Sequence, residues 1–273
     1  MRTILLLLSL LTVLCTARAQ DYQTNVKRAM ELLGNDSIDA AETLLREALK
    51  LQPAIKSNAI IYQYLGRIEE QRGNQQEALR NYDTGLNISP STLGILMDRA
   101  ALYMRMGNEK KALADYNAVI ELNADHTEAL FVRAYLYTKQ RMYKPARADY
   151  QHLIQLEPEN LNAHLGLVLL NEKTGRPQEA MEAINALVQL HPRESRLYAV
   201  RAGMEEERKQ YETAQHDYDQ AIALDPENAD YLIARAAFYI HTHKSKRAKA
   251  DLHRALELGA SREEVAQLLS EIR

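Results

Sequence analysis

The small and hydrophobic residues of this chain recur with a period of 34 positions. An alanine marks each period, and these marker alanines are Ala78, Ala112, Ala146, Ala180, Ala214 and Ala248. A bulky residue stands four positions after each alanine and an aliphatic one four positions further, as Tyr116 and Ile120 do. This spacing places the three side chains on one face of an α-helix. The second half of each period therefore predicts an amphipathic helix.

The first half of each period predicts another helix. Twelve positions before each marker alanine stands a residue that is small in all periods but one, and these residues are Gly66, Ala100, Ala134, Val168, Ala202 and Ala236. Two antiparallel helices can approach closely where both carry small side chains, so we expect contacts such as Ala100 against Ala112. Val168 is larger and should push the two helices of its period slightly apart.

Turn-forming residues separate the predicted helices. Gly73, Gly107 and Gly175 lie between the two helices of their periods, where a residue with left-handed backbone ends the first helix. The second helix stops near a proline in several periods, at Pro90, Pro158, Pro192 and Pro226. Only 10 Gly and 7 Pro occur in 273 residues. This scarcity favours helices joined by short connections over a sheet protein.

The 34-residue unit resembles the tetratricopeptide repeat, a helix-turn-helix unit with a small residue in the eighth place, alanine in the twentieth, an aromatic residue near the twenty-fourth and proline in the thirty-second. Seven units match, at residues 22–55, 59–92, 93–126, 127–160, 161–194, 195–228 and 229–262. Departures include Leu45 and Leu252 in the aromatic place, and Ala124 and Ala260 in the proline place.

The resemblance implies an all-α fold, a right-handed superhelical α-solenoid of seven helix-turn-helix repeats. We expect a single array over residues 20–273, in which stacked neighbours bury the core that no repeat can bury alone. Residues 263–273 should form a capping helix for the last repeat, because Val265, Leu268, Leu269 and Ile272 have helical spacing.

Residues 1–19 have the features of a secretory signal peptide. Arg2 gives a positive start, residues 4–14 are almost entirely apolar, and residues 17–19 have the small-x-small pattern of a cleavage site. The apolar stretch is about half as long as a bilayer core is thick, so a permanent membrane anchor is disfavoured. We expect cleavage after Ala19 and no transmembrane segment in the mature chain.

The alternative is lipid anchoring at Cys15. Bacterial lipoprotein signals usually carry Gly or Ala just before the cysteine, and Leu14 stands there, so cleavage after Ala19 is favoured. Cys15 is the one cysteine of the chain and would leave with the leader. The mature protein would then have no thiol for a disulfide, a zinc site or nucleophilic attack.

Composition and charge exclude several partner classes. Hydrophobic residues make up 46% and charged residues 26%, which is ordinary globular composition rather than that of a disordered chain. The formal net charge is −3, and no run of Lys and Arg resembles a nucleic-acid or anionic-lipid footprint. We expect no nucleic-acid partner.

Two side-chain patterns were weighed as candidate chemistry. An Arg and an Asp stand 16 positions apart in four repeats, as Arg99–Asp115, Arg133–Asp149, Arg201–Asp217 and Arg235–Asp251, while two repeats lack both partners. Four copies favour a structural ion pair over acid–base catalysis. A metal site at His241, His243 and His253, with a carboxylate such as Asp251, is disfavoured, because His243 occupies a turn place. No HExxH, GxSxG, GxGxxG or P-loop pattern occurs. We therefore expect no enzyme activity, cofactor or metal.

The concave surface is where the resemblance places partner binding. It implies contributions from the first helix of each repeat, and in the middle repeats this lining is apolar: Met97, Met104, Phe131, Tyr135, Leu165 and Leu169. Exposed together, they would suit an extended or helical partner segment. The alternative is that these six side chains only pack between adjacent first helices and form no exposed groove. Rim charges expected to give specificity are Arg67, Glu70, Glu172 and Glu206. The Lys and Asn of the family's carboxylate clamp are absent.

These observations favour a non-enzymatic scaffold that binds one or more protein partners along the groove. The alternative is a component that holds a lipid or glycan inside the superhelix for envelope assembly or uptake. A cleavable signal on such a scaffold resembles envelope proteins of Gram-negative bacteria. The expected location is therefore the periplasm or the periphery of the outer membrane.

Overall fold

Residues 2–272, the part of the chain that the computed structural model describes, form fifteen α-helices and no strand; side chains are described for residues 18–272. The helices are α1 (Arg2–Gly34), α2 (Ile38–Leu51), α3 (Asn58–Gln71), α4 (Gln75–Ile88), α5 (Leu93–Arg105), α6 (Glu109–Leu122), α7 (Thr127–Lys139), α8 (Tyr143–Leu156), α9 (Leu161–Lys173), α10 (Pro177–Leu190), α11 (Ser195–Glu207), α12 (Tyr211–Leu224), α13 (Ala229–His241), α14 (Ser245–Glu257) and α15 (Arg262–Glu271). The prediction of an all-α repeat fold is confirmed.

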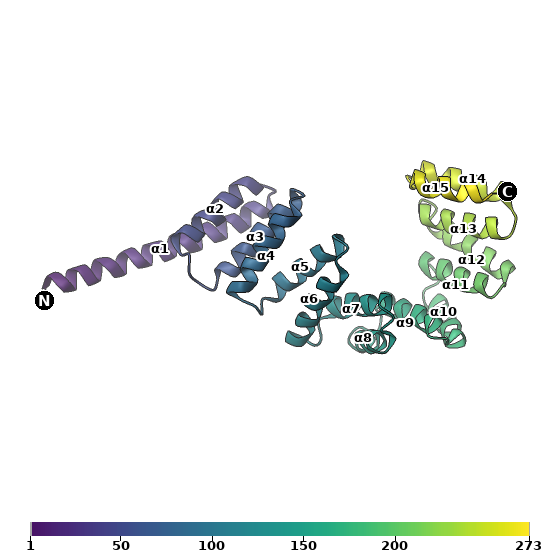
Figure 1. The fold of residues 1–273 in the computed structure, drawn as a ribbon, viewed down its shortest axis with the longest axis horizontal. Helices are drawn as coiled ribbons and strands as arrows, with labels where there is room; N and C mark the ends of the chain where they lie inside the picture. Colours follow the sequence, from purple (N-terminus) through teal and green to yellow (C-terminus); the bar gives the residue numbers. More distant parts are fainter. Residues whose placement is uncertain (1, 273) are drawn as a thin grey trace. The chain divides into compact units, whose positions relative to one another are not determined.

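The chain divides into two compact units, and the second begins at Glu157. Within each unit, consecutive helices pair as antiparallel hairpins that stack on their neighbours (Figure 1). The first unit contains the pairs from α1–α2 to α7–α8, and the second those from α9–α10 to α13–α14. Each of the seven predicted repeats contains one pair. That all seven form a single array over residues 20–273 stays a prediction.

Helix α15 covers the last pair, as expected of a capping helix. Ser261 precedes it and its hydroxyl accepts a hydrogen bond from the Glu264 backbone N–H at 3.4 Å. Val265 is 1% exposed and packs in a cluster that also contains Phe238 of α13 and Leu252 of α14. The helix thereby shields the apolar face of the last repeat from water.

The first helix extends further toward the N-terminus than the first predicted repeat. Helix α1 is continuous from Arg2 to Gly34, and Tyr22 and Ala29 bury its second half against α2 and α3. The side chains that define the predicted leader, including Cys15, lie outside the residues whose side chains are described. Among the helices as described, none is long and apolar enough to cross a membrane.

Small residues bring the helices of each pair together. Every marker alanine is fully buried, and so are Ala100, Ala134, Ala202 and Ala236 on the facing helices. In the repeat at 59–92, Gly66 allows the closest approach, because a Cβ atom there would lie 2.4 Å from the ring of Tyr82. In the repeat at 161–194, where Val168 fills the small place, α9 and α10 pack less closely than the other pairs. This agrees with the expectation for Val168.

The turn between the two helices of a pair uses the left-handed conformation. Gly73, Gly107 and Gly175 have φ values of 79°, 72° and 73°, which confirms the role predicted for them. The same turn in other repeats holds Arg141, Lys209 and His243, each at φ 59°. Residues with a Cβ atom adopt this conformation at a cost of roughly 1–2 kcal/mol. The surrounding helices therefore impose the turn even where no glycine is present.

The four predicted Arg and Asp pairs all form, and each is bidentate. Arg201 is typical: its Nε and Nη2 donate to the two carboxylate oxygens of Asp217 at 2.5 and 2.9 Å. The remaining nitrogen, Nη1, donates to Asn185 of the preceding repeat at 3.0 Å. The equivalent third acceptors of Arg99, Arg133 and Arg235 are Asp83, Asn117 and Asp219. We call this arrangement the Arg–Asp fork; its link to the preceding repeat was not predicted.

Charge is retained in the fork despite burial. The hydrogen bonds from Arg201 to Asp217 raise the pKa of the guanidinium, although burial acts in the opposite direction. The Asp217 side chain is only 2% exposed, so the pair holds a carboxylate that water barely reaches. Three of the seven repeats do without the fork: at its places, two carry Leu65 with Asn81 and Leu167 with Ala183, and the first carries Arg28 with Leu44.

Gly66→Ala is expected to destabilise the protein by about 1–2 kcal/mol, because the clash with Tyr82 outweighs the better helix propensity of alanine. Gly203→Ala is the matched control. Gly203 also lies within a first helix, but the nearest atom to a Cβ there is the Tyr218 hydroxyl at 3.9 Å. This control should gain about 0.5–1 kcal/mol from propensity alone. Urea unfolding measures both; a stabilised Gly66→Ala variant would contradict the close approach.

Arg201→Leu alone should destabilise the protein by about 3 kcal/mol, because it leaves the buried Asp217 carboxylate without its partner. Arg201→Leu combined with Asp217→Ala should be less destabilising than either single change, since it reproduces the residues present at Leu167 and Ala183. Arg46→Ala removes an exposed pair with Glu42 and should change stability by less than about 0.5 kcal/mol. Equal losses for the single and double variants would rule out this account of the fork.

Candidate functional site

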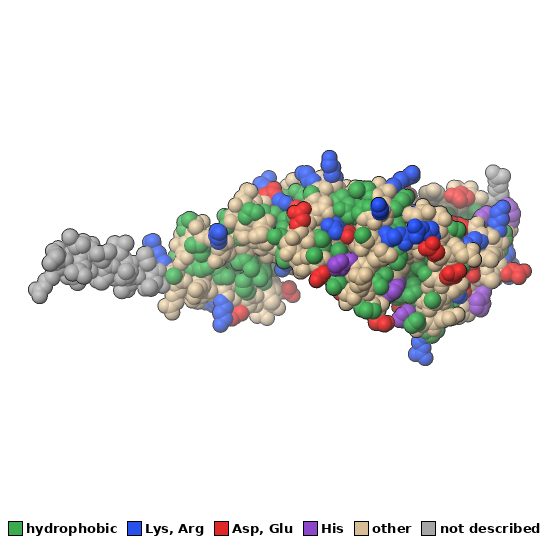
Figure 2. Space-filling view, turned by 90° about the horizontal axis from the view of Figure 1, so that it is seen from below, with side chains coloured by type: hydrophobic (Ala, Val, Ile, Leu, Met, Phe, Trp, Pro, Cys, Tyr) green, Lys and Arg blue, Asp and Glu red, His purple; other side chains and the backbone are tan. Residues whose placement is uncertain are grey.

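The residues predicted to line the groove differ in exposure. Tyr135 of α7 and Leu169 of α9 are 43% and 44% exposed. Met97 and Met104 of α5 are half-buried against the core of the first unit. Phe131 of α7 is also half-buried, with its ring 6.2 Å from that of Tyr150. Figure 2 shows hydrophobic side chains in several patches among charged ones on the face in view.

Leu165 requires a correction. It was expected in the exposed groove, but it is 8% exposed and belongs to the core cluster of the second unit with Val168 and Ile184. The 34-residue periodicity places Leu165 on the first helix of its repeat. Whether a neighbouring helix covers its side chain depends on packing, which the periodicity does not predict. Of the two predicted groove residues in the second unit, Leu169 is therefore exposed and Leu165 is not.

The four predicted rim charges are all engaged with other residues of their own unit. Arg67 donates to both carboxylate oxygens of Asp98, at 2.7 and 3.0 Å. Glu70 accepts a hydrogen bond from the Tyr82 hydroxyl at 2.5 Å and also pairs with Arg105. Arg67, Glu70, Asp98 and Arg105 line a hollow of about 300 Å³ on the first helices of two adjacent repeats.

The other two rim charges lie in the second unit. Glu172 pairs with Arg208, and Glu206 accepts from the Tyr218 hydroxyl at 3.1 Å and lies 2.9 Å from the His241 ring. All four rim residues thus join neighbouring repeats. Their partners were missed, although Arg or His and Asp or Glu residues 31 to 36 positions apart in the sequence are a signal that could have found them.

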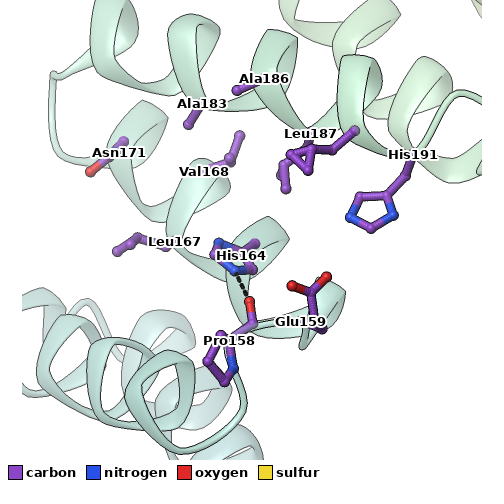
Figure 3. A pocket seen from close by; sticks show the side chains of 11 residues that line it. Pro158, Glu159, His164, Leu167, Val168, Asn171, Ala183, Ala186, Leu187 and His191 are labelled. Carbon is purple, nitrogen blue, oxygen red and sulfur yellow. Dashed lines mark hydrogen bonds between the residues drawn. The ribbon is translucent and has the colours of Figure 1, made fainter.

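A cavity of about 350 Å³ lies between α9 and α10 in the second unit (Figure 3). Leu167 and Val168 of α9 and Ala183, Ala186 and Leu187 of α10 point into the shared space. The part of its wall that α9 and α10 form is mostly aliphatic, and Asn171 of α9 adds one amide side chain to it. This cavity was not predicted from the sequence.

The cavity occupies the place where other repeats carry the Arg–Asp fork. Leu167 and Ala183 stand at the Arg and Asp positions, and Ile184 replaces the usual tyrosine of the twenty-fourth place. Shorter side chains and the wider spacing at Val168 leave space between the helices. In the repeat at 59–92, Leu65 at the Arg position is 1% exposed and packs in the core of the first unit with Ile61 and Ile68. The absence of the fork can be read from the sequence, but how the surrounding side chains pack decides whether a cavity results.

Polar groups stand at the mouth of the cavity: in the segment that precedes α9, in the first turn of α9 and just after α10. The ring of His164 bonds through Nε2 to the Pro158 carbonyl oxygen at 2.8 Å. Glu159 lies beside it and is exposed to solvent, and His191 lies across the opening (Figure 3). The site thus combines an apolar interior with one carboxylate and two imidazoles at its edge.

The histidines weighed as metal ligands do not converge. His241 contacts Glu206, His243 holds the left-handed turn, and Asp251 is bonded to Arg235. Among the described side chains, no group of three or more His, Cys, Asp or Glu residues could hold a metal ion.

Three models of the tetratricopeptide repeat family match the chain, at residues 26–91, 93–126 and 137–203. Together they cover more than half of it. No curated protein matches the sequence significantly. A tetratricopeptide repeat protein from Parabacteroides merdae has a similar crystal structure, with 27% identity and a TM-score of 0.79. That alignment covers 93% of this chain and 99% of the other.

Two more distant structures share the fold alone. PilF of Pseudomonas aeruginosa is 20% identical with a TM-score of 0.56, over 79% of this chain and 99% of that one. A chain of the Cut9–Hcn1 hetero-tetramer of the APC/C is 15% identical with a TM-score of 0.59, over 90% of this chain and 55% of that one. Proteins built from this repeat are generally non-catalytic scaffolds for protein–protein interaction. The chain belongs to the tetratricopeptide repeat family.

Proposed function

We propose that the protein is an exported, non-enzymatic scaffold that binds a segment of a partner protein over the first helices of its repeats. The observation that carries this proposal is the exposure of Tyr135 on α7, beside the half-buried Phe131 of the same helix. Tyrosine is a frequent anchor of protein interfaces, because its ring offers a large apolar area and its hydroxyl a hydrogen bond.

The surroundings of Tyr135 suit an interface with mixed chemistry. The Lys139 ammonium lies 5.8 Å from the centre of the Tyr135 ring and also pairs with Glu109 of α6. A partner side chain that packs on the Tyr135 ring would therefore lie close to a cation. Apolar contact would supply affinity and the nearby charges would select the partner.

The proposed location rests on the first 19 residues. A positive start, an apolar stretch and a small-x-small pattern occur in the order that a secretory signal requires. We propose the periplasm or the outer-membrane periphery of a Gram-negative cell as the destination, with peripheral association with the envelope through the bound partner.

A photo-crosslinking residue at position 135 is expected to give a defined adduct with a partner in intact cells. The matched control is position 142, because Met142 is 46% exposed but lies in the turn between α7 and α8. Tyr135→Asp should remove binding of the identified partner by at least about tenfold while leaving helix content unchanged. Equal adducts from both positions would mean that exposure, rather than this surface, determines the crosslink.

Cleavage of the leader is tested by determining the N-terminus of the full chain after expression in a Gram-negative host. We expect the envelope fraction to contain protein that begins at Gln20. Ala19→Arg should block cleavage and keep the leader attached, since the processing site requires a small residue. A mature chain that begins with a lipid-modified Cys15, or an intact Met1 in the cytoplasm, would contradict the proposal.

A further inference from the structure

We propose that the cavity between α9 and α10 is a second partner site, which takes one large apolar side chain from a protein segment that carries Lys or Arg within a helical turn of it. The site lies between the two helices of one repeat, whereas the proposed scaffold function uses the first helices. It therefore adds a contact that the function above does not require.

The interior of the cavity defines the apolar part of the ligand. Its volume of about 350 Å³ is at the small end of ligand sites, which span roughly 300–1,000 Å³. Leu167, Val168 and Leu187 face the space and present no side-chain polar atom to it. A phenylalanine or leucine side chain would fill the space that the guanidinium occupies in the four repeats with a fork.

The surface beside the cavity favours a protein segment over a free small molecule. Leu190 lines the cavity at the end of α10 and is 67% exposed, the largest exposed fraction among the large hydrophobic residues described as exposed. A molecule confined to the cavity would leave this side chain in water. A segment that crosses the mouth would cover Leu190 as well, and burial of both surfaces adds to its affinity.

The charge at the mouth specifies the polar part of the ligand. Glu159 is the one lining residue of the Asp, Glu, Lys and Arg types, and it is exposed. Glu157, on the other side of Pro158, is also exposed and accepts a hydrogen bond from Asn160 at 2.6 Å. A cation next to the apolar anchor would pair with Glu159, whereas an acidic segment would be repelled.

The test begins with a displayed library of random 16-residue peptides selected on the full chain. Selected peptides are synthesised and their dissociation constants measured by fluorescence anisotropy. We expect a common pattern of one Phe, Leu or Trp with Lys or Arg three or four positions away. Glu159→Gln should weaken binding severalfold.

Two variants fill the cavity in different ways. Leu167→Arg with Ala183→Asp introduces the pair of residues that forms the fork in four other repeats. Ala186→Phe fills the space from an exposed position and so poses little risk to folding. Each should weaken peptide binding by at least about tenfold. Tyr135→Asp should leave it unchanged, which separates this site from the proposed scaffold surface. Circular dichroism checks that each variant is folded.

The proposal is overturned if the selected peptides bind both filled variants as tightly as the parent, or if the selection yields no peptide with the apolar and basic pattern. It is also overturned if the thiol of an Ala183→Cys variant, in a Cys15→Ala background, does not react with maleimide in the absence of peptide. A lipid that occupies the cavity, detected by native mass spectrometry of the purified chain, would also replace the partner segment as its ligand.

Discussion

Close approach of paired helices at small residues is the constraint on which the rest of this structure depends. Wherever a marker alanine faces Ala or Gly, the backbones come near enough for tyrosine and leucine side chains to fill both sides of the crossing. Distances between polar groups then follow. Arg201 can reach Asp217 with both ends of its fork only because their two helices are held at a fixed separation.

The repeat at 161–194 shows what happens when that constraint is relaxed. Val168 spreads the helices, Ile184 is shorter than tyrosine, and Leu167 and Ala183 replace the charged pair. Each change alone is modest, but all of them act on the same interior space and leave it partly empty. Charged groups that stabilise four repeats are thus exchanged for an apolar surface in a fifth.

Periodicity in the sequence was sufficient to predict the helices, their pairing, the left-handed turns at glycine and the Arg–Asp ion pairs, because each depends on residues a fixed distance apart. Periodicity could not predict which side chains on one face of a helix are buried by neighbouring helices. Leu165 and Leu169 lie one turn apart on α9, yet one is buried and the other exposed. That difference comes from neighbouring helices. Arg105, which pairs with Glu70, and Arg208, which pairs with Glu172, were missed because they lie in adjacent repeats, although their spacing from the glutamates was a signal.

The fork also has a direction along the chain. Its third hydrogen bond always runs from an arginine to a residue nearer the N-terminus, as from Arg99 to Asp83 and from Arg235 to Asp219. During synthesis on the ribosome, each arginine therefore emerges after the acceptor it will contact in the preceding repeat. A growing chain can dock each hairpin that carries a fork onto the hairpin already made before it, without waiting for residues still to be translated.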